Sequence, residues 1–466
     1  NKNALSRTIK DFTKNSKYAH PKYWAPFIPI GKHWGTSESK DQKFQTISST
    51  SFGNNNVKDM FDDSIKIKDT IYAIAFSGSF EDDKYKDSEG GTGYIVKYDL
   101  NGNFISKHLL TNVWENNHVL LGRHKNLIII GGTEVNSGSG ESLRVGVFNI
   151  ENNTFKIIID KIKLDEDITS NAVQRVISGL TDKENLYIVA TASNKIDGTT
   201  EFSHYHIIKY NFKNKSTHVH NLPINKENYY VDDFFHSVAF NIDGNINVFI
   251  ATLRNEVINS EDDPENVWEG FFTEHYILEN EKFVSKKVYK NIQIRGYLPE
   301  EKMLYGHVFE NIDNHKYESK KDPLMFYKIN NSDISFFSFK DNIIKLHHRL
   351  EIPKRQYLKD IIKMGDKYLI LGNTHTKLKW SFNNEDGTDI EDYVKGAQPI
   401  ELDMQEYISA DPFLILYDKS FKYLDSVVYP DRILSVFSSI EKIDDDHYML
   451  FELNKGSRAS VTINKL

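Results

Sequence analysis

The chain of 466 residues contains no cysteine. This absence excludes a disulfide framework, a cysteine zinc site, an iron–sulfur cluster and a thiol nucleophile within the chain. No stretch of about 18 consecutive apolar residues occurs, so the sequence predicts no membrane-spanning helix. The compartment stays open: a cytoplasmic location is slightly favoured, and an extracytoplasmic one also agrees with the absence of cysteine.

An excess of positive charge is lacking too, because the formal net charge is −8 at pH 7. Nucleic-acid binding needs clustered Lys and Arg that displace counterions from phosphates, so this balance argues against a nucleic-acid partner. The sequence has no Gly-x-Ser-x-Gly elbow for a serine nucleophile and no Gly-rich loop that leads into a helix. No motif therefore identifies a catalytic residue in this chain.

Strand-like segments fill the sequence from residue 37 onward, as short runs rich in Ile, Val, Tyr and Phe between Asn, Asp and Gly. One hairpin pattern recurs, at residues 94–110, 145–159, 205–220, 276–289, 336–350 and 413–428. The copies are spaced roughly 50 to 80 residues apart, which indicates a repeat architecture. A further pair of strand-like runs precedes each copy, and four strands per repeat are typical of a β-propeller blade.

The two ends of the sequence complete one more blade. Residues 433–443, 447–453 and 459–463 supply three strands, and residues 43–48 supply the fourth. Sharing a blade between both ends removes the free edges of an open sheet. The sequence therefore predicts an all-β fold, a seven-bladed β-propeller over residues 37–466 with terminal strand closure. A pair of β-sandwiches is the alternative.

The first 36 residues have a different character and read as a helix over residues 5–16 followed by an aromatic segment at 16–34, SKYAHPKYWAPFIPIGKHW. This segment resembles the closing motif of CHAT domains, the caspase-like peptidase modules that are often joined to tetratricopeptide repeats. The matching residues are His20, Pro21, Tyr23, Trp24, Ala25, Pro26, Phe27, Ile28 and Gly31. The resemblance implies that residues 1–36 are the C-terminal helix-strand tail of a caspase-like α/β domain that precedes the propeller.

The resemblance does not make this chain a protease. CHAT peptidases cleave with a His and Cys dyad upstream of the motif, and the chain does not include that region; Lys32 also stands where Asp is common. Peptidase activity is thus expected only if an upstream domain belongs to the same protein. The alternative is an aromatic arm that packs on the propeller. Because the sequence starts at Asn1 and has no signal-peptide pattern, we expect a processed precursor or a longer parent protein.

Three long connections between the second and third strands of a repeat are acidic, at residues 80–91, 255–270 and 383–393. Long loops are often functional, and a propeller gathers these on one face, where their negative field would attract a basic partner. Surface solvation and calcium binding are the alternatives, although Phe382 stands where an EF-hand loop requires Asp. The predicted partner-binding residues are Glu81, Asp82, Asp83, Glu261, Asp262, Asp263, Glu265, Trp268, Trp380, Asp386 and Asp389.

Two His-x-His pairs occupy the strands of the third hairpin, His204 with His206 and His218 with His220. Alternation places each pair on one face of its strand. Cross-strand pairing of His204 with His220 and of His206 with His218 would bring four imidazoles together around Zn²⁺. The alternative is a solvated blade edge, because a small shift of register separates the rings.

The sequence favours a protein-binding or substrate-recruiting module of a larger CHAT-like protein, which acts through its long acidic loops. Two other functions stay open. A propeller hydrolase acting on glycans in the central channel predicts a buried carboxylate cluster at the channel mouth and turnover by this chain alone. A structural scaffold subunit predicts stable association that does not depend on the acidic loops. Whether the chain is an enzyme is therefore uncertain.

Overall fold

The computed structural model describes most of the chain after residue 43. The described residues are 44–52, 59–77, 92–110, 118–136, 140–160, 162, 164, 173–193, 195–196, 199–200, 204–222, 229–230, 237–258, 265–309, 316–317, 332–350, 356–375, 410–428, 436–454 and 458–466. Residues 1–36, with the CHAT-like motif from His20 to Gly31, lie outside this part of the chain.

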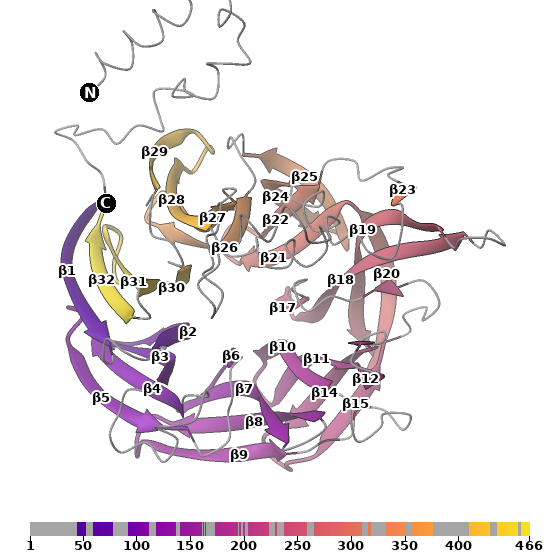
Figure 1. Cartoon of the computed structure of the whole chain (residues 1–466), viewed down its shortest axis with the longest axis horizontal. Coiled ribbons are helices and arrows are strands. Elements are labelled where there is room, and N and C mark those ends of the chain that lie inside the picture. The colour runs from indigo at the N-terminus through magenta and orange to yellow at the C-terminus, as the bar shows by residue number, and fades with distance from the viewer. Residues whose placement is uncertain are drawn as a thin grey trace, which may run out of the picture.

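Seven blades, each of four antiparallel strands, form a ring around a central axis (Figure 1). One parallel pairing, Val173 with Glu141, joins the sheets of blades 2 and 3. Blade 1 contains β2 (Met60–Ile67), β3 (Thr70–Ser77), β4 (Thr92–Asp99) and β5 (Phe104–Leu109). Blade 2 contains β6 (Val119–His124), β7 (Leu127–Asn136), β8 (Gly140–Asn149) and β9 (Thr154–Asp160). Blade 3 contains β10 (Val173–Thr181), β11 (Asn185–Ser193), β14 (His204–Asn211) and β15 (Thr217–Asn221).

The second half of the ring repeats the same order of strands. Blade 4 contains β17 (Val238–Ile242), β18 (Asn245–Ile258), β19 (Glu265–Glu279) and β20 (Lys282–Lys290). Blade 5 contains β21 (Ile292–Leu298), β22 (Met303–Phe309), β24 (Ser332–Lys340) and β25 (Ile343–Arg349). Blade 6 contains β26 (Gln356–Met364), β27 (Lys367–His375), β28 (Ala410–Asp418) and β29 (Tyr423–Val428).

Blade 7 joins the two ends of the propeller. Its strands are β30 (Val436–Lys442), β31 (His447–Asn454), β32 (Arg458–Lys465) and, on the outside, β1 (Gln45–Phe52). The register of β1 on β32 runs from Gln45 opposite Lys465 to Phe52 opposite Ala459. The predicted seven-bladed, all-β propeller with terminal strand closure is thus confirmed, and the sandwich alternative is wrong.

Four two-residue strands add to this frame. They are β12 (Lys195–Ile196), β13 (Thr199–Thr200), β16 (Tyr229–Tyr230) and β23 (Lys316–Tyr317). The strands β16 and β23 pair with β18 and β19, which run past the body of blade 4 as a long hairpin (Figure 1). Within the described residues, no helix is long and apolar enough to cross a membrane.

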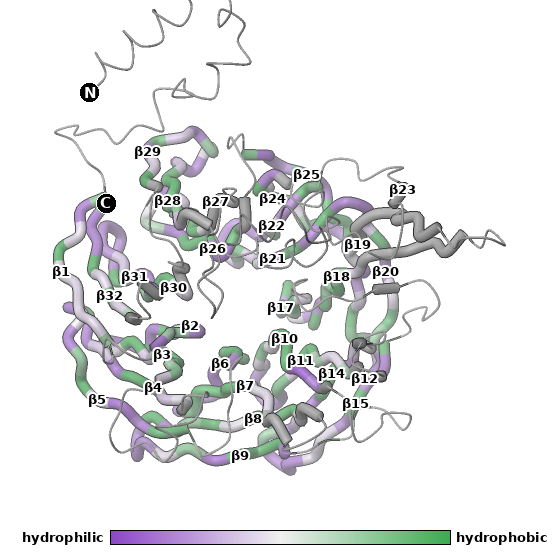
Figure 2. Tube along the Cα trace, viewed as in Figure 1, coloured by the Kyte–Doolittle hydropathy of each residue, from purple (hydrophilic) through white to green (hydrophobic). Residues whose placement is uncertain are grey.

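The hydrophobic core is divided among the seven seams between neighbouring blades, because each face of a blade is covered by the neighbouring blade on that side. The buried clusters follow this division, each with residues from two adjacent blades. At the seam between blades 7 and 1, the Phe61 ring lies edge-on to Phe451 at 5.1 Å between centroids. A second strand such as β3 is accordingly buried along almost its whole length, whereas an outer strand such as β20 is mostly exposed; Figure 2 shows the hydropathy along the chain. Short apolar runs between polar turns are why the strand pattern of the sequence is readable.

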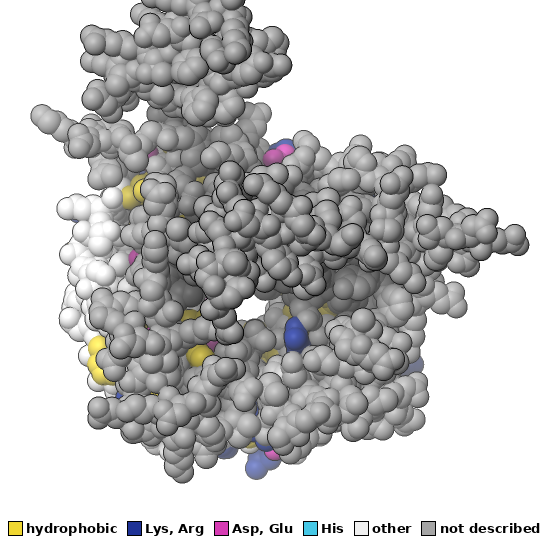
Figure 3. Space-filling model, in the orientation of Figure 1, with side chains coloured by type: hydrophobic (Ala, Val, Ile, Leu, Met, Phe, Trp, Pro, Cys, Tyr) yellow, Lys and Arg dark blue, Asp and Glu magenta, His cyan; other side chains and the backbone are white. Residues whose placement is uncertain are grey.

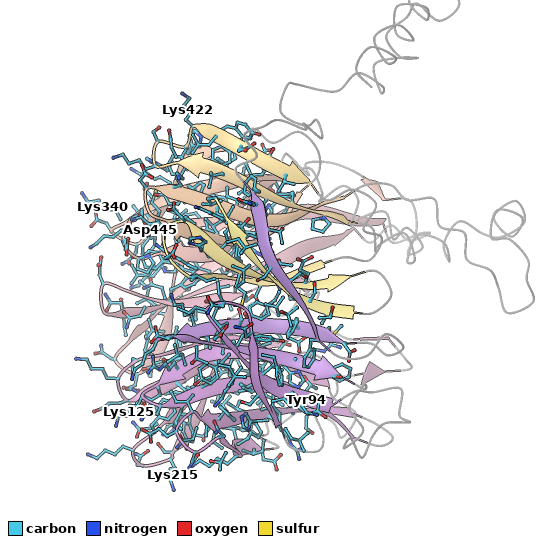
Figure 4. The ribbon with its side chains drawn as sticks, turned by 90° about the vertical axis from the view of Figure 1, so that its left-hand side faces the viewer. Tyr94, Lys125, Lys215, Lys340, Lys422 and Asp445 are labelled. Atoms are coloured by element: carbon cyan, nitrogen blue, oxygen red, sulfur yellow. The ribbon has the colours of Figure 1, made fainter. Side chains whose placement is uncertain are left out.

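The turns between first and second strands and between third and fourth strands lie on one face, which we call the tight-turn face. Lys125, Lys215, Lys340, Lys422 and Asp445 all lie on it (Figure 4). Asp or Asn at the end of a third strand closes several of these turns by accepting backbone N–H bonds. The third-strand residues that do so are Asp99, Asn149, Asn211 and Asp418. The connections between second and third strands leave from the opposite face, the long-loop face.

Candidate functional site

Most of the predicted partner-binding residues belong to connections on the long-loop face. Glu81, Asp82, Asp83, Glu261, Asp262, Asp263, Trp380, Asp386 and Asp389 lie outside the described residues. Glu265 and Trp268 lie in β19, where the backbone pairs them with Ile258 and Asn255 of β18. The interpretation of residues 255–270 as one loop is therefore wrong, because the blade 4 hairpin continues to a connection of residues 259–264.

The predicted pairing of the four histidines is also wrong. In the hairpin of β14 and β15, His206 lies opposite Asn221, Ile207 opposite His220, and Lys209 opposite His218. His206 and His220 therefore point to opposite faces of the sheet. The His206 ring contacts Asn221 Oδ1 at 2.9 Å through Nδ1. The His220 ring lies edge-on to Phe283 of blade 4. Nowhere in the described part of the chain do three or more His, Asp or Glu residues form a group that could hold a metal ion.

The inner strands share a backbone irregularity. Six of them, all but β17, carry a β-bulge that leaves one residue unpaired. The unpaired residues are Asp62, Leu121, Ile177, Arg295, Lys359 and Ser438. Bulges bend a strand and redirect its side chains, and they often occur beside functional sites. The bulges thus alter side-chain direction at the same level of almost every inner strand.

Four consecutive inner strands, β21, β26, β30 and β2, carry a cluster of charged and hydroxyl groups that we call the charged arc. Its members are Arg295, Lys359, Asp360, Ser439, Glu441, Asp63 and Ser64. Across the seam between blades 1 and 7, Ser64 Oγ donates to Glu441 Oε1 at 2.8 Å, and Ser439 Oγ donates to Ser64 Oγ at 2.8 Å. The Lys66 backbone N–H donates to Glu441 Oε2 at 3.2 Å. Both oxygens of Glu441 are thereby held in place.

Asp360 is held from the neighbouring blade. Tyr305 of β22 donates its hydroxyl to Asp360 Oδ1 at 2.9 Å, and the Ile361 backbone N–H donates to the same oxygen at 2.7 Å. The Tyr305 ring fits there because position 296 is glycine, where an added Cβ would lie 1.9 Å from Tyr305 Cζ. Arg295 Nη2 donates to the Leu358 backbone carbonyl at 3.0 Å, which ties the bulge of β21 to β26.

The carboxyl groups of the charged arc have raised pKa values. Burial raises the pKa of Asp63 to about 6, and the positive charge of Lys359 opposes this shift. Burial raises the pKa of Glu441 to about 7; the hydrogen bond from Ser64 opposes the shift, and the charges of Asp63 and Asp360 add to it. Burial also raises the pKa of Asp360, against the hydrogen bond from Tyr305. The three side chains keep some solvent access while protein atoms surround them closely. They therefore hold protons closer to neutral pH than free carboxyl groups do.

A histidine and an aspartate extend the polar network toward blade 2. The Nδ1 atom of buried His118 lies 2.8 Å from Oδ2 of Asp62, the bulge residue of β2. The other side of the ring lies against Gly93, where an added Cβ would approach Nε2 to 2.8 Å. His118 thus fixes the first of the two consecutive carboxylates of β2.

The inner strands opposite the charged arc carry two partly exposed apolar side chains. Leu120 of β6 and Ile177 of β10 are partly exposed on inner strands and pack against the seams beside them. An opening passes through the middle of the ring, and hydrophobic and basic side chains are visible beside it (Figure 3). Arg175 of β10 is partly exposed as well, so the strands opposite the charged arc carry both apolar and basic side chains.

Comparisons with known proteins give fold similarity only. No protein-family model and no curated protein match the chain. A puromycin-hydrolyzing peptidase from Mycobacterium tuberculosis is 8% identical with a TM-score of 0.46, over 87% of this chain and 53% of that one. An acylaminoacyl peptidase from Pyrococcus horikoshii is 9% identical with a TM-score of 0.42, over 85% and 49%. The chain thus spans about half the length of these two peptidases.

A third solved structure is similar over nearly its whole length. It is an oligogalacturonate lyase in complex with manganese, 10% identical with a TM-score of 0.45, and the match covers 91% of this chain and 97% of that one. Likenesses this remote carry no argument about the activity of this chain.

Proposed function

We propose that the propeller is a recognition module whose long-loop face binds a basic protein partner or recruits a substrate. The topology of the blades carries this proposal, because it sends every connection between second and third strands to one face. Three of these connections, residues 78–91, 259–264 and 376–409, have a combined negative charge greater than the −8 of the whole chain. A concentration of one sign of charge on one face attracts a partner of the opposite sign.

The same proposal includes an upstream domain. The match of His20, Pro21, Tyr23 and Trp24 to the CHAT closing motif supports a caspase-like peptidase domain before the propeller. In such a protein the propeller would select what the peptidase domain meets. Intact mass and N-terminal sequencing of the product of the complete gene test this part, and a product that lacks an upstream His and Cys dyad would contradict it.

Charge reversal on the long-loop face tests partner binding. We expect the variant with Glu261, Asp262, Asp263 and Glu265 replaced by Lys to bind the partner at least about tenfold more weakly at low salt, because rim charges govern attraction and orientation. The partner is first captured with the unaltered chain and identified by mass spectrometry, and its affinity is then measured by surface plasmon resonance.

A matched control reverses charge on the tight-turn face, where Glu300 is 74% exposed and Asp445 is 73% exposed. The variant with both replaced by Lys should keep the original affinity. Equal weakening by both variants, or no weakening at low salt by the long-loop variant, would contradict the proposal.

A second candidate function is hydrolysis of a glycan in the channel, and the raised pKa values of Asp63 and Glu441 favour it. Glycoside hydrolysis uses two carboxyl groups, of which one gives a proton while the other activates water or attacks. We expect this chain alone to release reducing ends from a glycan of a broad panel, and Glu441→Gln to lower the rate at least about 100-fold. Failure of the unaltered chain on every glycan would rule this candidate out.

A further inference from the structure

We propose that the charged arc, together with Leu120 and Ile177 opposite it, forms a binding site for a polyhydroxylated ligand, a sugar or a sugar-like polyol, inside the channel. This inference rests on the second candidate function for its ligand class, but it requires binding alone and no bond cleavage. The inner strands β21, β26, β30 and β2 supply the polar groups, and β6 and β10 supply the apolar ones.

The chemistry of the charged arc matches hydroxyl groups. A hydroxyl both donates and accepts, so a site for several hydroxyls needs acceptors and donors at close quarters. Asp63, Asp360 and Glu441 supply carboxyl oxygens on β2, β26 and β30. Lys359 and Arg295 supply N–H donors, and their charges act on Asp360. A site for a single ion would carry charged groups of one sign, whereas the charged arc carries both acceptors and donors.

The acceptors are fixed before any ligand arrives. Tyr305 and the Ile361 N–H hold one oxygen of Asp360, and Ser64 and the Lys66 N–H hold the two oxygens of Glu441. An ionised carboxyl group offers about four acceptor positions, and a protonated one offers a donor beside its remaining acceptors, so these contacts leave capacity for ligand hydroxyls. Groups already held in place lose little conformational freedom when a ligand binds, which favours affinity.

The opposite wall suits the rest of a sugar ring. Pyranose rings expose C–H groups between their hydroxyls, and these groups favour apolar contacts. Leu120 and Ile177 pack against the seams but stay partly exposed on β6 and β10, across the channel from β26 and β30 (Figure 1). Arg175 of β10 is partly exposed beside them and adds a further N–H donor. Binding sites for small molecules combine an apolar lining with a few fixed polar groups in this way.

Other ligand classes fit less well. A divalent metal would need several carboxylates around one point, and the described residues contain no such group. A phosphate or another strong anion would meet three carboxyl groups, Asp63, Asp360 and Glu441, against two cations, Lys359 and Arg295. A neutral ligand with several hydroxyls avoids both conflicts, because each partner on the arc can meet it with one hydrogen bond.

The test uses the full chain and a panel of neutral sugars: glucose, galactose, mannose, xylose and the corresponding β-linked disaccharides. Saturation-transfer NMR at about pH 6 identifies the binders, and isothermal titration calorimetry measures the affinity. We expect Asp360→Asn and Lys359→Met each to weaken the best ligand at least about tenfold, since each removes a hydrogen bond to a charged group. Asp445→Asn on the tight-turn face is the matched control and should leave the affinity unchanged. Thermal melting checks that each variant is folded.

The possible results separate this inference from the proposed functions. Saturable sugar binding that Asp360→Asn weakens supports the site, whether or not the glycans of the broad panel are hydrolysed. If no sugar of the panel binds, the proposed site is wrong. It is also wrong if a sugar binds, or a product is released, equally well with the unaltered chain, Asp360→Asn and Lys359→Met. Partner capture responds only to the long-loop variants, so its outcome bears on the recognition module alone.

Discussion

Replacing Gly306 by alanine is expected to lower the free energy of unfolding by about 3 kcal/mol, the upper end of the usual cost of overpacking. Gly306 lies in β22 opposite Ile294 of β21. A Cβ there would lie 1.9 Å from the Gln293 carbonyl oxygen and 3.1 Å from the Arg295 backbone nitrogen. Both obstacles are backbone atoms, so no side-chain rotation can relieve the overlap. The two strands would have to separate beside the bulge that carries Arg295.

Gly244→Ala is the matched control for this experiment. Gly244 has a φ of +87° in a tight turn, and no atom lies within 4 Å of the position of an added Cβ. Its replacement therefore carries only the cost of a left-handed backbone, about 1 kcal/mol. Urea unfolding followed by circular dichroism gives both values. Equal losses for the two variants would show that the close approach of β21 and β22 is not what limits position 306.

The propeller was predictable from the sequence because each part of its pattern is local. Alternation along the strands, aromatic ends and Asn or Asp in the turns repeat with every blade, and the last three strands lacked a partner that only residues 43–48 could supply. Turn residues such as Asp99 and Asp418 mark the third-to-fourth connections because their side chains cap the backbone of the turn.

The register of the histidine hairpin was not predictable from alternation alone. Asn211 accepts backbone N–H bonds from Lys213 and Asn214, and Lys215 takes a φ of 60°. The backbone N–H of Lys215 also donates to the Asn211 carbonyl. These contacts make a wider turn than a symmetric one centred on residue 212. Because side chains alternate with a period of two, the resulting odd shift places His206 and His220 on opposite faces.

The charged arc was foreseen only as a carboxylate cluster required by a channel enzyme, without its residues. Two features hide it in the sequence. Asp62 and Asp63 lie consecutively in β2, where a bulge breaks the period of two, and in the sequence they resemble a turn. The partners also come from distant blades: Ser64 and Glu441 are separated by 377 positions. Closure of the ring brings them together, and no local pattern encodes that contact.

Removing the charge of Glu441 should stabilise the propeller at high pH. Its pKa is raised from 4.5 to about 7 in the folded chain. Between these values the folded chain holds more protons than the unfolded chain, so the contribution of Glu441 to stability is full below about pH 4.5 and is lost as the pH rises through 7. Glu441→Gln cannot ionise. We therefore expect its stability relative to the unaltered chain to rise by about 2 kcal/mol from pH 5 to pH 8, because solvent in the channel reduces the full linkage value.

The effect of Glu441 is isolated by the difference in the free energy of unfolding between Glu441→Gln and the unaltered chain. Burial lowers the pKa of His275 to about 4. The stability that this histidine contributes is therefore full above about pH 6.5 and is lost as the pH falls through 4, whereas the contribution of Glu441 is lost as the pH rises. Both chains contain His275, and its contribution cancels in the difference. Urea unfolding at pH 5 and pH 8 provides the four free energies. Asp445→Asn serves as the control, since this exposed carboxylate is ionised at both pH values. A stability difference between Glu441→Gln and the unaltered chain that does not change with pH would mean that Glu441 is already ionised at pH 5, and the acid–base role of the charged arc would then lose its basis.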